Sequence, residues 1–317
     1  MIAGGTTVGS RPAVAGRRKY GKVARREALW GFACASPWFF GFLIFTAGPM
    51  LASIGLSLTS WDLLTAPHFA GLSNYGTLLS GDSSVWHSLQ VTTFYAALAV
   101  PLHTAFGLFL AILLNQRIRF QRFVRTVYYL PSVVSGVAVA LLWRWIFSPD
   151  FGLLNTLLGY VGIAGPAWLS DEHTVIFAFV IMSLWGVGAG MIIYLAGLQG
   201  IPTDLYEAAQ VDGAGTLTQF WQITVPMLSP VIFFNVIIGV IGALQTFTQA
   251  YVMTNGGPHD ASLFFMLYLY RNAFEYFKMG YASALAWVLF FYIMALTLLV
   301  IRSSAVWVYY EGRTRGR

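Results

Sequence analysis

Residues 88–115 read SLQVTTFYAALAVPLHTAFGLFLAILLN, and this stretch decides the class of fold. It contains no Asp, Glu, Lys or Arg, and His103 is its one histidine. A helix that crosses the ~30 Å hydrocarbon core of a membrane needs roughly 20 mostly apolar residues. The stretch is long enough and apolar enough, so we predict that it is a membrane-spanning helix.

Five further stretches have the same character, and they occupy residues 28–58, 124–147, 174–200, 227–253 and 279–302. Their lengths suit helices and exceed the ~10-residue alternating strands of a membrane barrel. The first stretch is too long for the 7–15-residue core of a signal peptide, and a long basic leader precedes it, so we expect a retained helix. The sequence therefore predicts an all-α membrane protein with six transmembrane helices.

The composition of the 317-residue chain excludes other classes of protein. Hydrophobic residues make up 57% of the chain and charged residues only 9%, against about 25% charged residues in a soluble domain. Intrinsic disorder needs low hydrophobicity, so it is excluded. Cys34 is the single cysteine and cannot pair within the chain, which excludes a disulfide scaffold.

The basic residues predict the orientation in the membrane. Seven precede the first predicted span, four lie between the second and third, and four lie from Arg302 onward, whereas only Arg144, Arg271 and Lys278 fall on the other side. The positive-inside rule then places both termini in the cytoplasm. The net charge of +6 therefore reflects the orientation of the chain in the membrane. No basic stripe with stacking aromatics lies on a soluble domain, so nucleic-acid binding is not expected.

The segment 200–226, between the fourth and fifth predicted spans, is polar but has no Lys or Arg. Pro202 can open a helix, and Asp204 and Glu207 would complement its dipole. Gly213 and Gly215 can end that helix, and 216–219 has capping-box spacing for a second helix that runs until Pro226 turns the chain into the fifth span. The segment predicts a helix–turn–helix on the cytoplasmic face. A docking surface and an ordinary interfacial helix packed on lipid both fit.

These residues resemble a known family. The pattern Glu207-Ala208-Ala209-x-x-Asp212-Gly213-Ala214, followed by Ile223-x-x-Pro226, is similar to the EAA loop of ABC importer permeases. Three other stretches are similar to the carbohydrate-uptake branch with its maltose-type and glycerol-phosphate-type permeases: 71–75 (GLSNY), 254–258 (TNGGP) and 280–284 (GYASA). The resemblance covers roughly residues 28–310. Several family members carry eight spans or a large external domain, whereas this chain has six predicted spans and no such domain.

The resemblance implies a type I ABC importer permease fold with cytoplasmic EAA coupling helices. It implies a second homologous permease, two ABC ATPase copies and an extracytoplasmic solute-binding protein as partners, with a carbohydrate or polyol as substrate. It also places the chain in a prokaryotic plasma (inner) membrane, surrounded by lipid. The residues that would couple to the ATPase are Asp204, Leu205, Glu207, Ala208, Ala209, Asp212 and Gly213.

The chain has no sequence that would bind ATP through a P-loop. Such a loop requires Lys followed by Ser or Thr, and none of Lys19, Lys22 and Lys278 is followed by either. We therefore expect no cofactor on this chain, no catalysed reaction, and ATP with Mg²⁺ on the partner ATPase. The predicted spans also lack carboxylates, which argues against a proton-coupled carrier. A stand-alone secondary carrier or channel for a small polar solute is the alternative function.

Uncharged polar residues inside the spans are the candidates for sugar contact, because sugars need hydrogen bonds and aromatic faces. They are Ser132, Ser135, Ser183 with Trp185, Asn235, Gln245, Thr246, Thr248 and Gln249, beside the glycines at 186, 188 and 190. Gln245 and Gln249 are four residues apart and would share one helix face with nearby Gly242. The resemblance favours Ser135, Ser183, Gly186, Gly242, Gln245, Thr246 and Gln249 as substrate-binding residues. Hydrogen bonding between helices is the competing role for each.

The chain is expected to form one membrane domain. A basic leader, 1–27, precedes a permease domain, 28–310, whose coupling loop is 200–226, and a short cytoplasmic tail, 311–317, follows. His68, His87, His173 and His259 are scattered over the external loops without paired spacing, so no metal site is predicted. The stretch 255–258 (NGGP) is expected to be a tight turn outside the membrane, although contact with the binding protein would also fit.

Overall fold

The computed structural model of the chain describes residues 21–116 and 119–309, and it divides the chain into two compact units, Met1–Ser53 and Ile54–Arg317. The predicted leader falls outside the described residues up to position 20, and the predicted tail 311–317 falls outside them entirely. The first unit contains α1 (Lys22–Phe42), the π-helical turn η1 (Leu43–Ala47) and the start of α2 (Gly48–Ser57). The described residues are mainly helical, as predicted.

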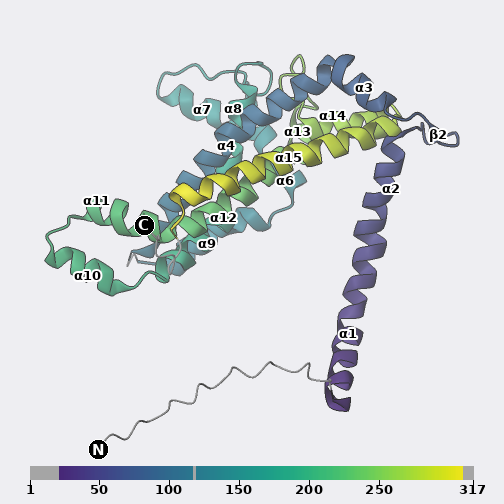
Figure 1. Ribbon diagram of the computed structural model, residues 1–317. Coiled ribbons are helices and arrows are strands. Elements are labelled where there is room, and N and C mark those ends of the chain that lie inside the picture. The colour runs from purple at the N-terminus through teal and green to yellow at the C-terminus, as the bar shows by residue number, and fades with distance from the viewer. Residues whose placement is uncertain (1–20, 117–118, 310–317) are drawn as a thin grey trace, which may run out of the picture. The chain divides into compact units, whose positions relative to one another are not determined.

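The second unit contains one short antiparallel pair, β1 (Thr59–Ser60) with β2 (His68–Phe69), and a bundle of helices. In chain order the helical elements are α3 (Ser73–Ser80), α4 (Ser83–Asn115), α5 (Gln121–Tyr129), η2 (Leu130–Val133), α6 (Gly136–Ile146), α7 (Leu153–Tyr160), α8 (Val175–Trp185), α9 (Gly188–Gln199), α10 (Thr203–Val211), α11 (Thr216–Gln219), η3 (Phe220–Thr224), α12 (Val225–Leu244), α13 (Thr248–Met253), α14 (Phe265–Tyr270), η4 (Arg271–Glu275) and α15 (Met279–Trp307). Figure 1 shows α4, α12 and α15 running alongside one another.

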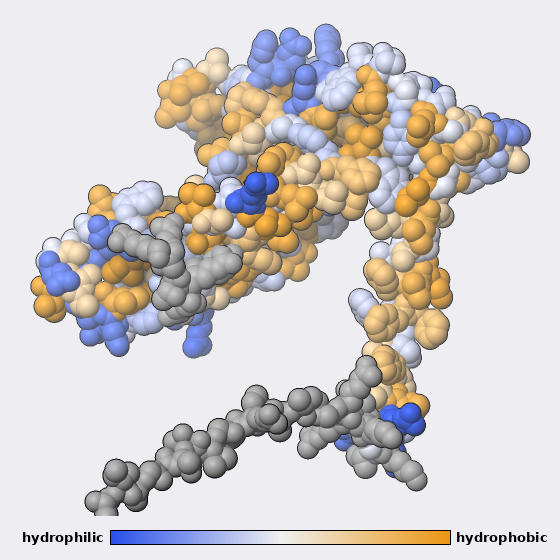
Figure 2. Space-filling view, viewed as in Figure 1, coloured by the Kyte–Doolittle hydropathy of each residue, from blue (hydrophilic) through white to orange (hydrophobic). Residues whose placement is uncertain are grey.

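Four continuous helices in the described residues are long and apolar enough to cross a membrane: Arg25–Ser57, Ser83–Asn115, Thr216–Leu244 and Met279–Trp307. Two bent pairs raise the number of possible spans to six if each pair is one span. Figure 2 shows hydrophobic residues along the sides of the helices in the second unit and hydrophilic residues around α10. Residues 21–116 and 119–309 therefore contain four to six candidate spans.

The third and fourth predicted spans are not straight helices. The helical pair 121–133 and 136–146 is bent by 102°, because Val134 and Ser135 between the two parts have extended backbone conformations. The pair 175–185 and 188–199 is bent by 50° at Gly186 and Val187. At Gly188 a Cβ atom would lie 2.1 Å from the Tyr128 carbonyl oxygen, so only glycine allows α9 to approach α5 this closely.

The predicted boundaries of the fifth span, 227–253, are wrong at both ends. Its helix starts at Thr216 and continues through η3 and Pro226 to Leu244, so Pro226 does not turn the chain. The π-turn η3 immediately precedes this proline and widens the helix where the proline ring would meet the preceding turn. The helix then ends at Leu244, and residues 245–247 separate it from α13.

Two buried apolar clusters hold the second unit together. One joins α4, α8 and α14 around Tyr95, Phe179 and Phe264. The other joins α4, α9 and α12 around Leu110, Tyr194 and Leu228. Since α4 contributes to both, the two clusters lie at successive levels along this helix.

The ends of the bundle differ in their polar contacts. At the end that carries α10 and α11, which we call the α10 end, the backbone N–H of Tyr309 donates to the Ser229 hydroxyl over 2.8 Å. This bond brings the chain beyond α15 to the start of α12. At the same end the Arg125 guanidinium of α5 donates to the Leu114 carbonyl of α4 over 3.0 Å.

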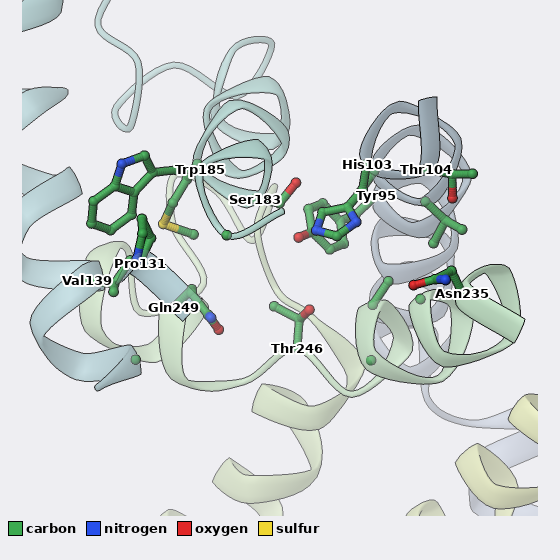
Figure 3. Close-up of a pocket in the computed structure, with 18 of the residues that line it drawn as sticks. Tyr95, His103, Thr104, Pro131, Val139, Ser183, Trp185, Asn235, Thr246 and Gln249 are labelled. Atoms are coloured by element: carbon green, nitrogen blue, oxygen red, sulfur yellow. The ribbon is translucent and has the colours of Figure 1, made fainter. Parts of the chain in front are cut away.

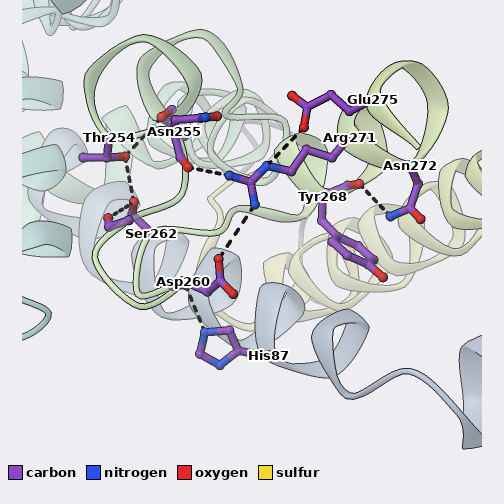
Figure 4. A network of polar contacts seen from close by, with 11 residues as sticks. His87, Thr254, Asn255, Asp260, Ser262, Tyr268, Arg271, Asn272 and Glu275 are labelled. Atoms are coloured by element: carbon purple, nitrogen blue, oxygen red, sulfur yellow. Dashed lines mark hydrogen bonds and ion pairs between the residues drawn. The ribbon is translucent and has the colours of Figure 1, made fainter. Parts of the chain in front are cut away.

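Arg271 organises the opposite end of the bundle (Figure 4). Its guanidinium donates to the Asn255 carbonyl over 2.5 Å and lies 3.8 Å from both Asp260 and Glu275. Asn255 and Gly256 both have positive φ angles, so the predicted turn after the fifth span is present. Thr254 and Ser262 close the loop with a 2.7 Å hydrogen bond between their hydroxyls.

Asp82 caps α4 at the same end and joins three helices. Its carboxylate accepts hydrogen bonds from the Ser84 backbone N–H over 3.0 Å, from the Tyr281 hydroxyl over 2.7 Å and from the Tyr268 hydroxyl. Partial burial opposes ionisation, but these hydrogen bonds outweigh it and hold the pKa of Asp82 below its ordinary value. The ionised carboxylate therefore stabilises the fold.

Replacing Asp82 tests this contribution. Because its folded-state pKa lies below the unfolded value, Asp82 stabilises the protein above about pH 4 and loses this effect as the pH falls through the lowered pKa. We expect Asp82→Asn to lower the thermal midpoint at pH 7 by roughly 2–4 °C, and the difference from wild type to shrink towards pH 3. Asp150→Asn is the control, since Asp150 is exposed and makes no side-chain hydrogen bond in the described residues. A pH-independent difference between Asp82→Asn and wild type would contradict this account.

Candidate functional site

A cavity of about 350 Å³ lies inside the second unit, where the broken helices meet. Pro131, Val134 and Gly136 come from the break before α6, Gly186 from the break after α8, and Thr246 from the break after α12. Irregular backbone at membrane depth is tolerated where it is buried in protein or lines a water-filled cavity. Residues of all three breaks therefore line the same cavity.

The cavity lies near the middle of α4 and between the two buried clusters. Tyr95 and Ala99 of α4 belong to the first cluster and Leu110 to the second, while His103 and Thr104 line the cavity between them. Gly190 of α9 lies close to Asn235 of α12, since a Cβ atom at Gly190 would be 3.2 Å from the Asn235 Oδ1 atom. The cavity thus lies between two apolar clusters that pack against α4 on either side of it.

The cavity has two kinds of wall (Figure 3). On one side Trp185 lies beside Pro131 and Val139, and on the other side lie Tyr95, His103, Thr104 and Asn235. Ser183 and Thr246 lie between these two groups. An aromatic and aliphatic wall facing hydroxyl, imidazole and amide groups suits a ligand that has both C–H faces and hydroxyl edges.

Five of the seven residues predicted to bind substrate line this cavity: Ser183, Gly186, Gly242, Thr246 and Gln249. Ser135, the N-cap residue of α6, does not line the cavity, whereas its neighbours Val134 and Gly136 do. Gln245 lines a different, apolar pocket among α12, α14 and α15. The predicted common face of Gln245 and Gln249 is wrong, because the helix break at 245–247 assigns them to different elements.

Several lining residues were not among the seven, and four of them carry a hydroxyl, imidazole or amide group: Tyr95, His103, Thr104 and Asn235, of which Asn235 was among the wider set of polar candidates. Tyr95, Ala99 and His103 follow each other at intervals of four, which places them on one face of α4. That spacing is the signal in the sequence that could have identified Tyr95 and His103. The Nδ2 atom of Asn235 donates to the Val231 carbonyl over 3.0 Å, and its Oδ1 atom remains an acceptor.

The α10 end carries the predicted helix–turn–helix. α10 begins at Thr203, with Pro202 as its N-cap residue and Asp204 in its first turn. The turn after it has two hydrogen bonds, from the Gly213 N–H to the Gln210 carbonyl and from the Ala214 N–H to the Ala209 carbonyl. With Gly213 at φ +80°, this is a Schellman motif, so Gly213 ends the helix as predicted.

The predicted capping box at the start of α11 is absent. Gly215 is the N-cap residue, Thr216 is already helical, and no side chain caps this helix. The Gln219 amide instead donates to the Ala214 carbonyl over 2.9 Å and stiffens the turn. The helix nevertheless begins at the predicted residue.

The residues predicted to couple to an ATPase lie mostly on the free surface of α10. Asp204, Leu205, Glu207, Ala208, Asp212 and Gly213 are exposed, and Ala209 is half-buried. Leu205 is 42% exposed and Val211 is 89% exposed, so apolar side chains are left uncovered between carboxylates. The exposed surface of α10 is therefore a mixture of apolar side chains and carboxylates.

Comparisons with known proteins agree with this architecture. Residues 103–314 match the family described as "Binding-protein-dependent transport system inner membrane component". The probable ABC transporter permease protein YesP of Bacillus subtilis is 44% identical over 299 residues, which cover 93% of this chain and 96% of YesP. The trehalose/maltose transport system permease protein MalF of Thermococcus litoralis is 33% identical over 286 residues, which cover 89% and 95% of the two chains.

A solved structure has the same fold. It is the crystal structure of a bacterial ABC transporter involved in the import of the acidic polysaccharide alginate, and its matching chain has a TM-score of 0.77 and 25% sequence identity. The match covers 90% of this chain and 97% of that chain. The relatives are permeases, which are transport subunits and not enzymes. This chain belongs to the family of binding-protein-dependent transport system inner membrane components, the permease subunits of ABC importers.

Proposed function

We propose that this chain pairs with a second, homologous permease to form the path for a sugar or related polyol, which a solute-binding protein delivers from outside. The cavity at the broken helices is the observation that carries the proposal. Its volume of about 350 Å³ falls within the ~300–1,000 Å³ of small-molecule sites. The sugar named for the similar MalF system and the polysaccharide named for the similar structure support this class of substrate.

The two walls of the cavity suit a sugar in different ways. The indole ring of Trp185 offers an apolar face for the C–H surface of a pyranose ring. Tyr95, His103, Asn235 and Thr246 offer donors and acceptors for its hydroxyl groups. No carboxylate lines the cavity in the described residues, so His103 has no acidic partner for a proton relay there. This lining favours transport that is not coupled to protons over the alternative of a proton-coupled secondary carrier.

The energy for transport would come from ATP bound with Mg²⁺ on two copies of a separate ATPase. The exposed face of α10 is the docking surface that we assign to it, as the EAA-like pattern implies. Three carboxylates, Asp204, Glu207 and Asp212, are exposed in this region beside Leu205 and Val211. They offer charge complementarity to a basic partner.

The arrangement of charges supports a cytoplasmic location for the α10 end and for the chain that follows α15. Arg125 and the Tyr309 contact belong to the α10 end, which is where an ATPase would bind. Arg271 and its partners Asp260 and Glu275 belong to the opposite end. This separation agrees with the positive-inside rule if the α10 end faces the cytoplasm of a prokaryotic cell.

Charge reversal at Glu207 tests the docking surface. We expect Glu207→Lys to lower ATPase co-purification and ATP-driven uptake by at least about tenfold, because a lysine would replace the carboxylate that faces the ATPase. Membrane insertion should be unchanged. Glu172→Lys, at an exposed glutamate of the segment between α7 and α8, is the control and should retain both. Normal uptake by Glu207→Lys would count against ATPase docking at this face.

Thiol labelling tests whether the cavity is open to water. Cys34 is the single cysteine, so Cys34→Ser gives a background without thiols. In that background we expect Thr246→Cys, in the cavity, to react with a hydrophilic thiol reagent at least about tenfold faster than Ile238→Cys. Ile238 is 54% exposed on the side of α12 and does not line the cavity, so lipid or a partner helix would shield it. Equal reaction rates would contradict a water-accessible cavity.

A further inference from the structure

One side chain of α10 attaches it to the rest of the bundle. Tyr206 is half-buried, and its hydroxyl lies 2.9 Å from the Thr224 hydroxyl in a hydrogen bond. Within the part of the chain that the structure describes, this is the one hydrogen bond made by a side chain of α10. No residue of α10 is fully buried, so the helix otherwise contributes little to the core.

The surroundings of this hydrogen bond are apolar. Tyr206 packs against the buried cluster around Leu110, Leu198 and Leu228, and Thr224 is only 8% exposed. The Thr224 hydroxyl also contacts the Gln219 carbonyl over 3.5 Å, so its 2.9 Å hydrogen bond to Tyr206 is the shorter of its two contacts and the one that reaches α10. α10 is therefore fastened at one defined point and is free on its opposite face.

Thr224 occupies a particular place in the fifth span. It is the last residue of the π-turn η3, and the continuous helix 216–244 runs on from it through Pro226. Eleven residues further along the same helix, Asn235 lines the cavity, followed by Gly239 and Gly242. At 1.5 Å per residue the distance from Thr224 to Asn235 along the axis is about 16 Å. A displacement of Thr224 thus moves the helix that forms one wall of the cavity.

We propose that the hydrogen bond between Tyr206 and Thr224 is the link through which a movement of α10 displaces α12 and changes the cavity. The inference rests on the proposed docking of an ATPase on α10. Tyr206 and Thr224 are positioning residues in this account, because neither lines the cavity. The competing route is the covalent chain on either side of α10, including the stiffened turn at 213–219.

Removing single hydroxyl groups distinguishes the two routes. Tyr206→Phe and Thr224→Val keep the shape of each side chain and delete the hydrogen bond. A second pair of the same chemistry provides a matched control, because the Thr93 hydroxyl of α4 lies 2.7 Å from the Tyr292 hydroxyl of α15. Tyr292→Phe and Thr93→Val remove a comparable bond that does not involve α10.

The measurement is the number of ATP molecules hydrolysed per sugar imported by the assembled complex in proteoliposomes, with trehalose and an arabinooligosaccharide as the sugars tested. We expect Tyr206→Phe and Thr224→Val each to raise this ratio roughly 2- to 10-fold, the range that corresponds to one hydrogen bond. The double variant should be no worse than the more severe single one, since both changes break the same bond. The control pair should keep the wild-type ratio, and ATPase co-purification should be unchanged in all variants.

Three results would overturn the inference: an unchanged ratio in both single variants, a double variant whose effect is the product of the two, or an equal rise in the control pair. Failure of the proposed function gives a different result. In that case the wild-type chain would not co-purify with an ATPase, or its complex would hydrolyse ATP without importing sugar. The first finding would refute the docking on α10 together with the link, and the second would refute the coupling of ATP hydrolysis to sugar import and with it the link.

Discussion

At membrane depth every backbone N–H and C=O group needs a partner, and this requirement shapes the centre of the protein. Three breaks in apolar helices meet there, and local turn bonds satisfy part of the backbone that each break frees. The Gly186 N–H donates to the Ser183 carbonyl over 3.1 Å, and the Gln245 N–H donates to the Gly242 carbonyl over 3.2 Å. Residues of all three breaks line a cavity that has a polar wall. The breaks and the cavity therefore depend on each other.

One helix connects the helix–turn–helix with the cavity. The helix 216–244 begins beside the helix–turn–helix, contains the π-turn η3, and ends at the break that brings Thr246 to the cavity. A rigid helix passes a displacement along its axis, whereas the broken helices around it can adjust at their bends. This division of roles explains how a chain without an ATP-binding loop can respond to a motor that lies on another polypeptide. It also explains why the contact between Tyr206 and Thr224 has mechanical importance beyond its energy.

Hydropathy predicted where the long apolar helices of the described residues lie, because length and absence of charge decide that question. It did not predict the bends, since Val134, Ser135 and Gln245 to Phe247 are compatible with an apolar helix and break it only through their backbone conformations. Gly213 was predicted correctly because a positive φ angle favours glycine. Tyr95 and His103 were missed as cavity residues, because each looks isolated until the four-residue spacing on α4 is considered. Five of the seven preferred residues do line the cavity.

The most direct test of the account is the energy source for uptake into proteoliposomes that contain this chain, its second permease, the ATPase and the solute-binding protein. The account predicts that labelled sugar accumulates against its gradient only when ATP and Mg²⁺ are supplied on the side that faces α10, and that ionophores have no effect. Uptake by this chain alone, driven by an ion gradient and abolished by ionophores, would contradict it.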